Sequence, residues 1–328
     1  MIDSTQFLNP KLYDADVERA GLRDGFGQGL LAIGEKDERV VGLCADLTDS
    51  TKMAAFAHTF PKRYVQIGVA EQNLASVASG MAAMGKIPFI TSYAMFSPGR
   101  NWEQIRTTIA YNNQPVKIAG SHGGVSVGPD GGTHQAIEDI AITRVIPRMH
   151  VVVPADIHEA KKVTEACVAI DYPFYIRLAR EKTPVVTLEN SPFEIGKANL
   201  VRNPTAPKVA IIACGMMVYN SLLAAKKLSD EGIEVSVLNN HTIKPMDTEA
   251  VLAVAKAAGR VVTVEEHQVA GGMGSAVAEF LVENYSVPME IVAVRDQFGQ
   301  SGTPHELIEY YGLGVNAIIE RVKKVLAR

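Results

Sequence analysis

Short apolar runs alternate with longer amphipathic stretches along the first part of the chain. The apolar runs cover residues 39–44, 64–67, 87–91, 116–120, 150–153 and 174–178. Stretches with helical periodicity lie between them, over residues 23–35, 72–84, 102–111, 134–144 and 157–168. Strands that are apolar on both faces are typical of a parallel sheet covered by helices on both sides. The pattern therefore predicts a doubly wound α/β domain over residues 1–190.

The pattern changes between residues 191 and 207. This segment is polar and contains several Pro and Asn residues, so we expect a linker there. A second α/β series follows over residues 208–328. Its apolar runs cover residues 208–213, 234–238, 260–265 and 289–294. We therefore expect two doubly wound α/β domains, of which the second is the smaller.

Composition narrows the class of protein. The chain has 328 residues, of which 47% are hydrophobic and 21% charged, as in a globular protein. The net charge of −4 argues against non-specific binding to nucleic acid. The N-terminal stretch is polar, and no apolar run is long enough to span a bilayer. We therefore expect a cytoplasmic protein that binds neither nucleic acid nor membrane.

The cysteines give no sign of a metal site. Cys44, Cys167 and Cys214 are scattered through apolar segments, and no CxxC pair occurs. Such cysteines are interpreted as reduced thiols in the core of a cytosolic protein, and a zinc site is not expected.

Glu71 is a candidate functional acid. It stands at the head of a predicted helix of small residues, in the segment VAEQNLASVASG, soon after a strand-like run. A buried acid costs free energy unless a specific partner uses it. The alternative interpretation is an acid at the start of a helix, which the helix dipole favours.

Further polar and aromatic candidates follow other strand-like runs, where open α/β sheets bind their ligands. Asp46 and Ser50 lie in the segment ADLTDS, after the run at 39–44. Tyr93 and Phe96 follow the run at 87–91, although their spacing alone is more typical of core aromatics.

A glycine-rich loop over residues 120–134 is the most informative of these segments. It carries His122, Asp130 and His134 between glycines, which allow the backbone to turn sharply and approach a ligand. We predict a ligand-binding loop, the alternative being a surface loop with incidental histidines.

Three arginines complete the set of candidates. Arg23, Arg177 and Arg180 are either surface charges or phosphate ligands, because a guanidinium group pairs two phosphate oxygens at once. A glycine pair elsewhere, Gly272 and Gly274, resembles part of a dinucleotide-binding fingerprint. The fingerprint requires a third glycine, but Val277 stands at that position. We therefore interpret the segment as a tight turn into a helix.

Taken together, these segments resemble the C-terminal two-thirds of transketolase, from about Arg19 onward. The segments that carry the resemblance, in family order, are LRDGFGQGLL, CADLTDS, FPKRYVQIGVAEQN, PFITSYAMFSPGRNWEQIR, GSHGGVSVGPDGGTHQAIEDIAITRVIP, LNNHTIKPMD, VVTVEEH, GGMGSAVAE and FGQSGTPHEL. The resemblance implies a mostly parallel-sheet pyrimidine-binding domain over residues 1–190 and a smaller transketolase C-terminal domain over residues 208–328.

The resemblance also implies roles for the cofactor site. Glu71 matches the acid that shares a proton with a ring nitrogen of the aminopyrimidine of thiamine diphosphate, so that the cofactor can attack a ketose carbonyl. Tyr93 and Phe96 match aromatic residues around the aminopyrimidine, and Asp46 is placed with them as a cofactor-binding residue.

Substrate roles follow from the same resemblance. Asp130 and His134 match residues that contact sugar hydroxyls, and with Glu71 they are the candidate catalytic residues. The residues that match ligands of the substrate phosphate are Arg23, Ser50, His122 and Arg180. Asp49 replaces a Pro found in some relatives beside the phosphate position.

The chain lacks the GDG motif with which full-length transketolases hold the diphosphate and its metal. We therefore expect the C-terminal subunit of a split transketolase, with no metal ligand of its own. It would transfer a two-carbon ketol unit between sugar phosphates, as in the pentose phosphate pathway. An N-terminal subunit would hold the diphosphate and Mg²⁺ or Ca²⁺, in an α2β2 assembly, and the chain alone would be inactive.

Three alternatives stay open. The β subunit of a 2-oxo acid dehydrogenase E1 shares the architecture and the Glu, but resembles the segment VGPDGGTHQAIED poorly. Deoxyxylulose-phosphate synthase is a further relative, normally a single longer chain. A non-catalytic scaffold protein is the third, although the joint presence of Glu71, Asp130 and His134 speaks against it.

Overall fold

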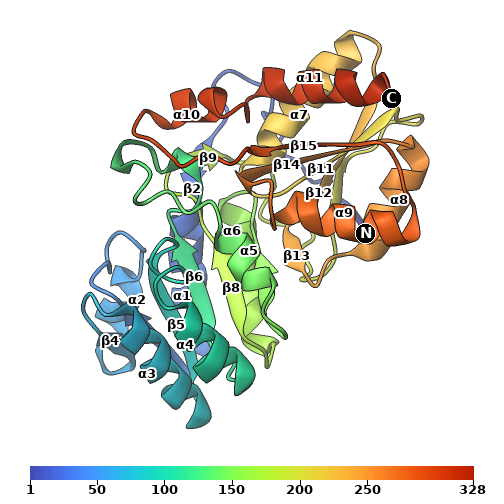
Figure 1. Ribbon diagram of the computed structural model, residues 1–328. Helices are drawn as coiled ribbons and strands as arrows, with labels where there is room; N and C mark the ends of the chain where they lie inside the picture. Colours follow the sequence, from blue (N-terminus) through green and yellow to red (C-terminus); the bar gives the residue numbers. More distant parts are fainter.

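Two sheets form the framework of the computed structural model, which describes residues 1–328 (Figure 1). The seven-stranded sheet has the order β13-β7-β8-β6-β5-β3-β4, and the six-stranded sheet has the order β1-β10-β12-β11-β14-β15. The prediction of two doubly wound α/β domains is confirmed. None of the helices combines the length and hydrophobicity needed to cross a bilayer.

The first domain supplies six parallel strands to its sheet. They are β3 (Val40–Cys44), β4 (Tyr64–Gln66), β5 (Ile87–Tyr93), β6 (Lys117–Ser121), β7 (His150–Val152) and β8 (Phe174–Arg177). All six agree with the predicted apolar runs to within a few residues. Most of their side chains are buried, as expected for a sheet covered by helices on both sides.

Helices cover both faces of this sheet. The helical segments are α1 (Leu22–Lys36), α2 (Ala54–Thr59), η1 (Pro61–Arg63), α3 (Glu71–Ala83), α4 (Trp102–Gln104), η2 (Ile105–Tyr111), η3 (Val125–Asp130), α5 (Asp139–Arg144), α6 (Ile157–Ala166) and η4 (Cys167–Ala169). Helices α1, α2 and α6 pack into one buried cluster with the sheet, and α3, η2 and α5 pack into another. The three cysteines are free and buried.

The helix predicted over residues 134–144 begins only at Asp139, where α5 starts. The reason lies in the preceding residues, whose backbone groups have partners outside a helix. The Gly124 N–H donates to the Ala136 carbonyl at 2.7 Å, and the Gln268 N–H of the second domain donates to the Ile137 carbonyl at 2.8 Å. These contacts hold the segment out of a helical conformation until α5 starts.

The second sheet combines parallel strands with two short additions. Its strands are β1 (Ile2–Asp3), β10 (Asn199–Arg202), β11 (Val209–Ala213), β12 (Val235–Asn239), β14 (Val261–Gln268) and β15 (Met289–Val294). The helices are α7 (Met217–Asp230), α8 (Thr248–Ala258), α9 (Met273–Asn284), α10 (Pro304–Tyr310) and α11 (Val315–Leu326). Figure 1 shows α7 and α11 on one side of this sheet and α8 and α9 on the other.

The segment expected as a linker, residues 191–207, contains a strand of the second sheet. Strand β10 pairs antiparallel with β12, and β1 at the N-terminus pairs parallel with β10. Leu200 and Val201 explain the pairing, because both are buried in core clusters of the molecule. Their polar neighbours masked this short apolar pair in the sequence.

The two halves of the chain also share the first sheet. Strand β13 (Thr242–Lys244) comes from the second half and pairs antiparallel with β7. A two-stranded sheet of β2 (Arg19–Gly21) and β9 (Lys182–Pro184) lies apart from both large sheets. One buried hydrophobic cluster contains residues of both halves, so the domains form one continuous core.

The turn before α9 agrees with its interpretation as a tight turn. Gly272 precedes the helix, and the Glu265 carboxylate accepts hydrogen bonds from the N–H groups of Met273 and Gly274, both at 2.7 Å. A side chain of the protein itself therefore satisfies the free amides at this helix start. These amides are not available to a dinucleotide phosphate.

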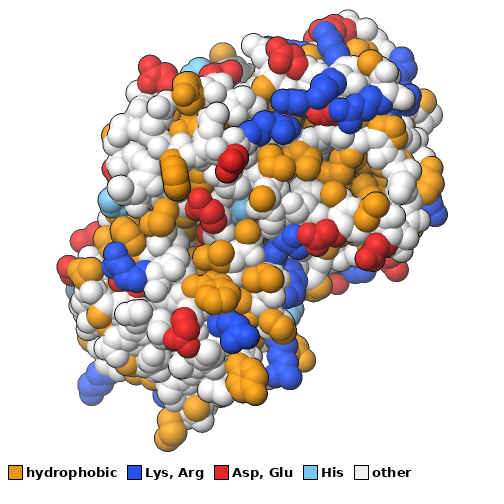
Figure 2. Space-filling view, in the orientation of Figure 1, with side chains coloured by type: hydrophobic (Ala, Val, Ile, Leu, Met, Phe, Trp, Pro, Cys, Tyr) orange, Lys and Arg blue, Asp and Glu red, His pale blue; other side chains and the backbone are white.

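Lys and Arg side chains gather over α11 on the face shown in Figure 2. Arg321, Lys324 and Arg328 all form ion pairs with Glu290 of β15. The shared carboxylate neutralises part of this positive charge, so the cluster stabilises the packing of α11 on the edge of the sheet.

Candidate active site

Glu71 is a buried carboxylate with one strong partner. Its side chain is 2% exposed at the first residue of α3. Arg100 Nη1 donates to its Oε2 at 2.7 Å, and Ser92 Oγ lies 3.4 Å from Oε1. The Arg100 side chain is 47% exposed, so one guanidinium group links the buried carboxylate to the surface.

The turn after β5 brings this guanidinium group into place. The N–H groups of Phe96 and Ser97 both donate to the Tyr93 carbonyl at 2.8 Å, which reverses the chain. Arg100 Cζ then lies 4.7 Å from the centre of the Phe96 ring. Arg100 thus joins Glu71 of α3 to an aromatic residue that follows β5.

Four predicted residues form an aromatic cluster. The Tyr93 ring is stacked on His122, with centroids 3.8 Å apart, and lies 6.2 Å from Phe96. His134 approaches both rings edge-on, at 6.2 Å from Tyr93 and 5.5 Å from Phe96. The glycine-rich loop therefore places its two histidines against the aromatic pair at the end of β5.

His122 is held as a neutral imidazole. Burial, with the nearby charges of Arg23 and Arg180, lowers its pKa to about 3. Its Nδ1 lies 2.6 Å from Ser121 Oγ, and its backbone adopts a left-handed conformation with φ of 60°. Non-glycine residues seldom adopt this conformation, and here it accompanies the stacking of the ring on Tyr93.

Arg23 and Arg180 bring positive charge to the same place. Arg23 donates to the backbone carbonyls of Ser50 at 2.6 Å and Arg180 at 2.7 Å. Arg180 donates to the Val127 carbonyl at 2.9 Å and forms an ion pair with Glu181 at 3.0 Å. Burial lowers the pKa of Arg23. The four residues predicted to bind a phosphate therefore lie together, with Ser50 and His122 beside two guanidinium groups.

Two predicted residues do not join this group through direct contacts. Asp130 is exposed at the end of η3, and Asp46 is exposed in a left-handed conformation with φ of 61°. The Asp46 backbone N–H donates to Gln66 Oε1 at 2.7 Å, but neither aspartate forms a hydrogen bond or ion pair with the aromatic cluster.

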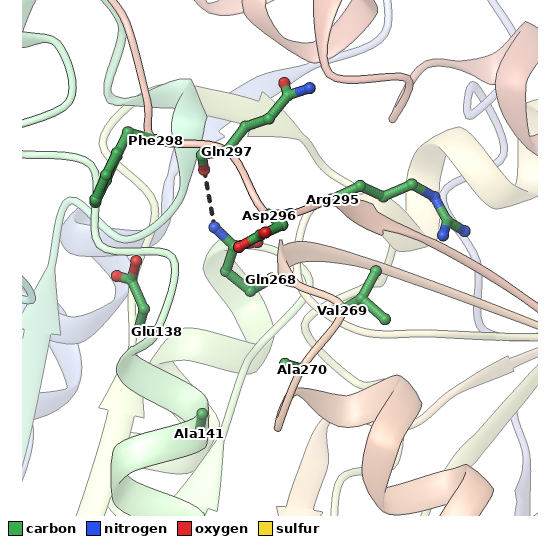
Figure 3. A pocket seen from close by; sticks show the side chains of 9 residues that line it. All are labelled: Glu138, Ala141, Gln268, Val269, Ala270, Arg295, Asp296, Gln297 and Phe298. Atoms are coloured by element: carbon green, nitrogen blue, oxygen red, sulfur yellow. Dashed lines mark hydrogen bonds between the residues drawn. The ribbon is translucent and has the colours of Figure 1, made fainter.

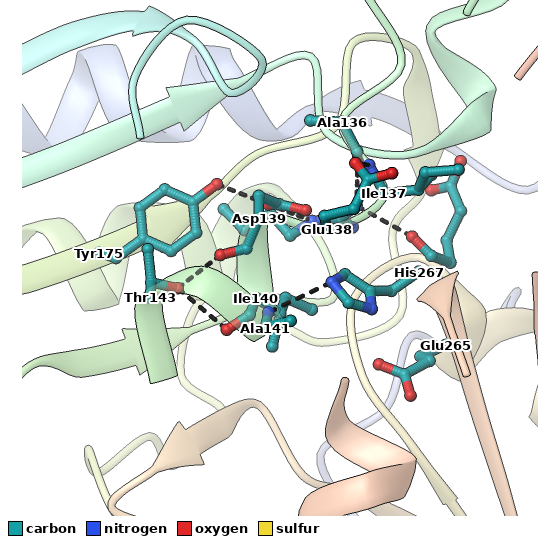
Figure 4. A network of polar contacts seen from close by, with 12 residues as sticks. Ala136, Ile137, Glu138, Asp139, Ile140, Ala141, Thr143, Tyr175, Glu265 and His267 are labelled. Carbon is teal, nitrogen blue, oxygen red and sulfur yellow. Dashed lines mark hydrogen bonds and ion pairs between the residues drawn. The ribbon is translucent and has the colours of Figure 1, made fainter. Parts of the chain in front are cut away.

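Arg177 is neither a surface charge nor a phosphate ligand, which were the two interpretations of its sequence context. Its side chain is 6% exposed, and its Nε donates to Asp139 Oδ2 at 2.7 Å. The Tyr175 hydroxyl donates to the same oxygen at 2.6 Å (Figure 4). Arg177 and Tyr175 therefore both donate to a carboxylate inside the protein, and Arg177 has a structural role.

Sequence reasoning missed the residues that surround Glu71. Arg100 pairs with its carboxylate, Ser92 faces the other carboxylate oxygen, and Asn101 donates to its backbone carbonyl at 2.9 Å. The one available signal was the segment SPGRN directly after Phe96, which contains a charged residue in an otherwise apolar and aromatic stretch.

A pocket of about 570 Å³ lies elsewhere, between α5 and the second domain (Figure 3). It is lined by Glu138, Ala141, Gln268, Val269, Ala270, Arg295, Asp296, Gln297 and Phe298. None of the predicted site residues lines it, so it is separate from the Glu71 site. No three His, Cys, Asp or Glu side chains come together in an arrangement that could hold a metal ion.

Two family models match the chain. The transketolase pyrimidine-binding domain matches residues 19–185, and the transketolase C-terminal domain matches residues 196–318. The chain belongs to the transketolase family. The resemblance found in the sequence motifs is thereby confirmed.

Similar proteins include both separate subunits and longer enzymes. The 6-deoxy-6-sulfo-D-fructose transketolase subunit of a Clostridium species is 42% identical over 96% of this chain and 98% of its own length. A subunit of the apulose-4-phosphate transketolase of Phocaeicola vulgatus is 37% identical over 92% of this chain and 97% of its own. Human transketolase is 32% identical and covers the whole chain, which spans 52% of that enzyme.

A solved structure agrees with the fold. A split-gene transketolase, described as an inactive beta4 tetramer, superposes with a TM-score of 0.87 and 42% identity, over 94% of this chain and 98% of its own. The protein is thus a transketolase subunit that corresponds in length to relatives built from separate subunits.

Proposed function

We propose that this transketolase subunit binds the aminopyrimidine half of thiamine diphosphate and the sugar substrates of a two-carbon ketol transfer. The observation that carries the proposal is the Glu71 carboxylate, which is buried beside an aromatic cluster and has only one strong hydrogen-bond partner. A buried acid whose second oxygen has only a long contact, to Ser92 Oγ, is suited to hold a proton at a ring nitrogen.

The residues of the site fit an aminopyrimidine. This ring is flat and carries a basic nitrogen, and the site offers aromatic faces from Tyr93 and Phe96 together with an acid, Glu71. When bound, thiamine diphosphate supplies the carbon nucleophile for attack on a ketose carbonyl. Glu71 would hold the proton at the ring nitrogen, and the two aromatic residues would orient the ring and exclude water.

The group of Arg23, Arg180, Ser50 and His122 would bind the anionic end of the sugar. Two guanidinium groups supply positive charge there, and the neutral His122 offers a hydrogen bond. Relatives of the chain are named for a sulfonated and for a phosphorylated sugar. We therefore propose a ketose with a terminal phosphate or sulfonate, whose hydroxyls would meet Asp130 and His134.

A partner subunit would hold the diphosphate of the cofactor and its metal ion. The split-gene relative that is described as an inactive beta4 tetramer supports the need for a second kind of subunit. One face of α3 carries the exposed residues Gln72, Asn73, Ser76 and Gly80, next to the buried Glu71. We propose an α2β2 assembly in which this face is covered.

A matched pair of substitutions tests the proposal. Glu71→Gln keeps the shape of the side chain but removes the ionisable acid, so ketol transfer by the assembled enzyme is expected to fall by at least about a hundredfold. Glu249→Gln is the control, because Glu249 is also in the first turn of a helix but is exposed. Light scattering would show the same assembly for both variants. Full activity of the Glu71→Gln complex would overturn the proposal.

A further inference from the structure

The loop that carries His122, Asp130 and His134 is closed at its base within the first domain. The Gly123 N–H donates to the Leu178 carbonyl at 3.1 Å, and the Gly124 N–H donates to the Ala136 carbonyl at 2.7 Å. Between these points the loop contains η3, a short 3-10 segment with a non-helical glycine at Gly128. Such a segment has few internal hydrogen bonds, so its conformation depends on what packs against it.

Glu266 of β14 packs beneath this loop from the second domain. Its side chain is buried, and one carboxylate oxygen, Oε1, accepts a hydrogen bond from the Ser126 N–H at the start of η3. A Cβ added to Gly124 would lie 2.3 Å from Glu266 Cδ, so only glycine leaves room for this carboxylate. The fit between the loop and Glu266 is therefore built into both segments.

Arg177 ties Glu266 to the end of the loop. Its Nη2 donates to the Glu266 carbonyl at 2.9 Å and to the Ala136 carbonyl at 3.1 Å. Asp139 accepts from the same guanidinium group and starts α5, directly after the loop. Figure 4 shows Asp139 and Ala136 of this network, with the Tyr175 hydroxyl bonded to the Asp139 carboxylate. A well-paired buried charge of this kind holds the two domains in one arrangement.

The outer side of the loop contacts another segment of the second domain. Gln135 Nε2 donates to the Gln300 carbonyl and to the Val125 carbonyl, both at 3.0 Å. A Cβ added to Gly132 would lie 2.6 Å from the Gly299 carbonyl oxygen. The loop is thus enclosed by the second domain on two sides.

We propose that Glu266 is a positioning residue, through which the second domain holds the glycine-rich loop so that its histidines and Asp130 meet the sugar substrate. This inference rests on the proposed function. Glu266 does not touch the aromatic cluster, so it acts through the Ser126 N–H and the backbone of the loop. The second domain then contributes to substrate binding as well as to stability.

Substitution of Glu266 is expected to raise the KM for the ketose donor. In the assembled enzyme, Glu266→Ala should raise KM by at least about tenfold with kcat changed by less than about threefold, because the loop loses its partner but the cofactor residues are untouched. Glu266→Gln keeps a hydrogen-bond acceptor and should restore most of the affinity. Thiamine diphosphate binding, followed by fluorescence quenching, should be unchanged.

Glu265→Ala is the matched control. Glu265 is the neighbouring buried acid, but its carboxylate caps α9 inside the second domain and does not reach the loop. Hydrogen exchange at residues 122–136 should become faster in Glu266→Ala and not in Glu265→Ala. Gln135→Ala removes the other anchor of the loop, and it supplies the test if Glu266→Ala does not fold.

The outcomes separate the inference from the proposed function. A raised KM and faster exchange in the loop variants alone support the inference. An unchanged KM in a folded Glu266→Ala enzyme, or an equal rise in Glu265→Ala, would overturn it. A wild-type complex without ketol transfer would instead refute the proposed function, and the exchange measurement would still decide whether Glu266 orders the loop.

Discussion

Glu71 and Arg100 form an ion pair between one buried and one half-exposed side chain, with 2.7 Å between Nη1 and Oε2. A buried carboxylate that loses its only strong donor is left with an uncompensated desolvation cost. Arg100→Leu should therefore lower the free energy of unfolding by about 1–2 kcal/mol, measured by urea denaturation. In a Glu71→Gln background the same change should cost clearly less, and equal costs in both backgrounds would contradict the pairing.

His241 gives a second prediction at this scale, concerning pH. It is buried against Phe193, with ring centroids 4.4 Å apart. Burial lowers its pKa to about 3, although the Lys197 backbone and Asp247 act in the opposite direction. An unfolded histidine binds a proton below about pH 6.5 that the folded protein excludes, so stability is lost as the pH falls from about 6.5 toward 3.

Replacement of this histidine should flatten the pH dependence. His241→Asn is expected to remove about 2 kcal/mol of the stability loss between pH 7 and pH 5. Urea denaturation at both pH values measures the difference, and His122, which acts in the same direction, is present in both proteins. An identical loss in the two proteins would show that His241 is not kept neutral by the fold.

For individual residues, the sequence predicts contacts within one loop or between the ends of strands, but not contacts with distant segments. That the aromatic pair and the two loop histidines lie together could be expected, because their segments follow strands and the ends of parallel strands meet at one edge of the sheet. Arg177 was misinterpreted because its partners, Asp139 and Glu266, are distant in sequence and one belongs to the other domain. Arg100 was missed because its pairing depends on the turn after β5.

At the scale of elements, α1 and α6 pack closely through glycine. A Cβ added to Gly25 would clash with the Ile157 carbonyl oxygen, which is backbone and cannot move aside. Gly25→Ala should therefore lower the free energy of unfolding by about 1–3 kcal/mol, despite the better helix propensity of Ala. Thermal or urea unfolding gives the value.

Gly80 of α3 is the matched control. Nothing lies within 4 Å of a Cβ added there. Gly80→Ala should stabilise the free chain by about 0.5–1 kcal/mol through helix propensity alone. If both substitutions had the same effect, the close packing of α1 on α6 would not be responsible.

Regular elements were predicted well where their pattern is strong. The parallel strands are apolar on both faces, so their positions followed from the sequence. Residues 134–138 and β10 were not foreseen, because their conformation is set by partners far along the chain. The predicted helix over residues 102–111 is one turn of α4 followed by the π-helix η2, a difference that the sequence pattern does not record.

At the scale of the whole molecule, the two domains are expected to unfold together. Strand β13 of the second half joins the first sheet, and the buried pair of Arg177 and Asp139 lies where the domains meet. Arg177→Met leaves Asp139 buried without its charge partner and should cost about 3–5 kcal/mol. Fluorescence and circular dichroism should still report one coincident transition.

An exposed pair provides the control for this change. Arg39 and Asp37 form an ion pair at 2.7 Å, and the Arg39 side chain is 63% exposed. Arg39→Met should lower the free energy of unfolding far less than Arg177→Met does, because water screens an exposed ion pair. Similar costs for both substitutions, or two separate transitions in the wild-type protein, would contradict a shared interior network.

The most direct test of the proposed function is ketol transfer from a ketose phosphate or sulfonate to an aldose phosphate, with thiamine diphosphate and Mg²⁺ present. The chain is assayed alone and then mixed with a subunit that carries the diphosphate-binding half of the enzyme. We predict activity only in the mixture, and its loss when Glu71→Gln replaces the wild-type chain. Equal activity of the chain alone, or no transfer by a mixture that forms a complex, would contradict the proposal.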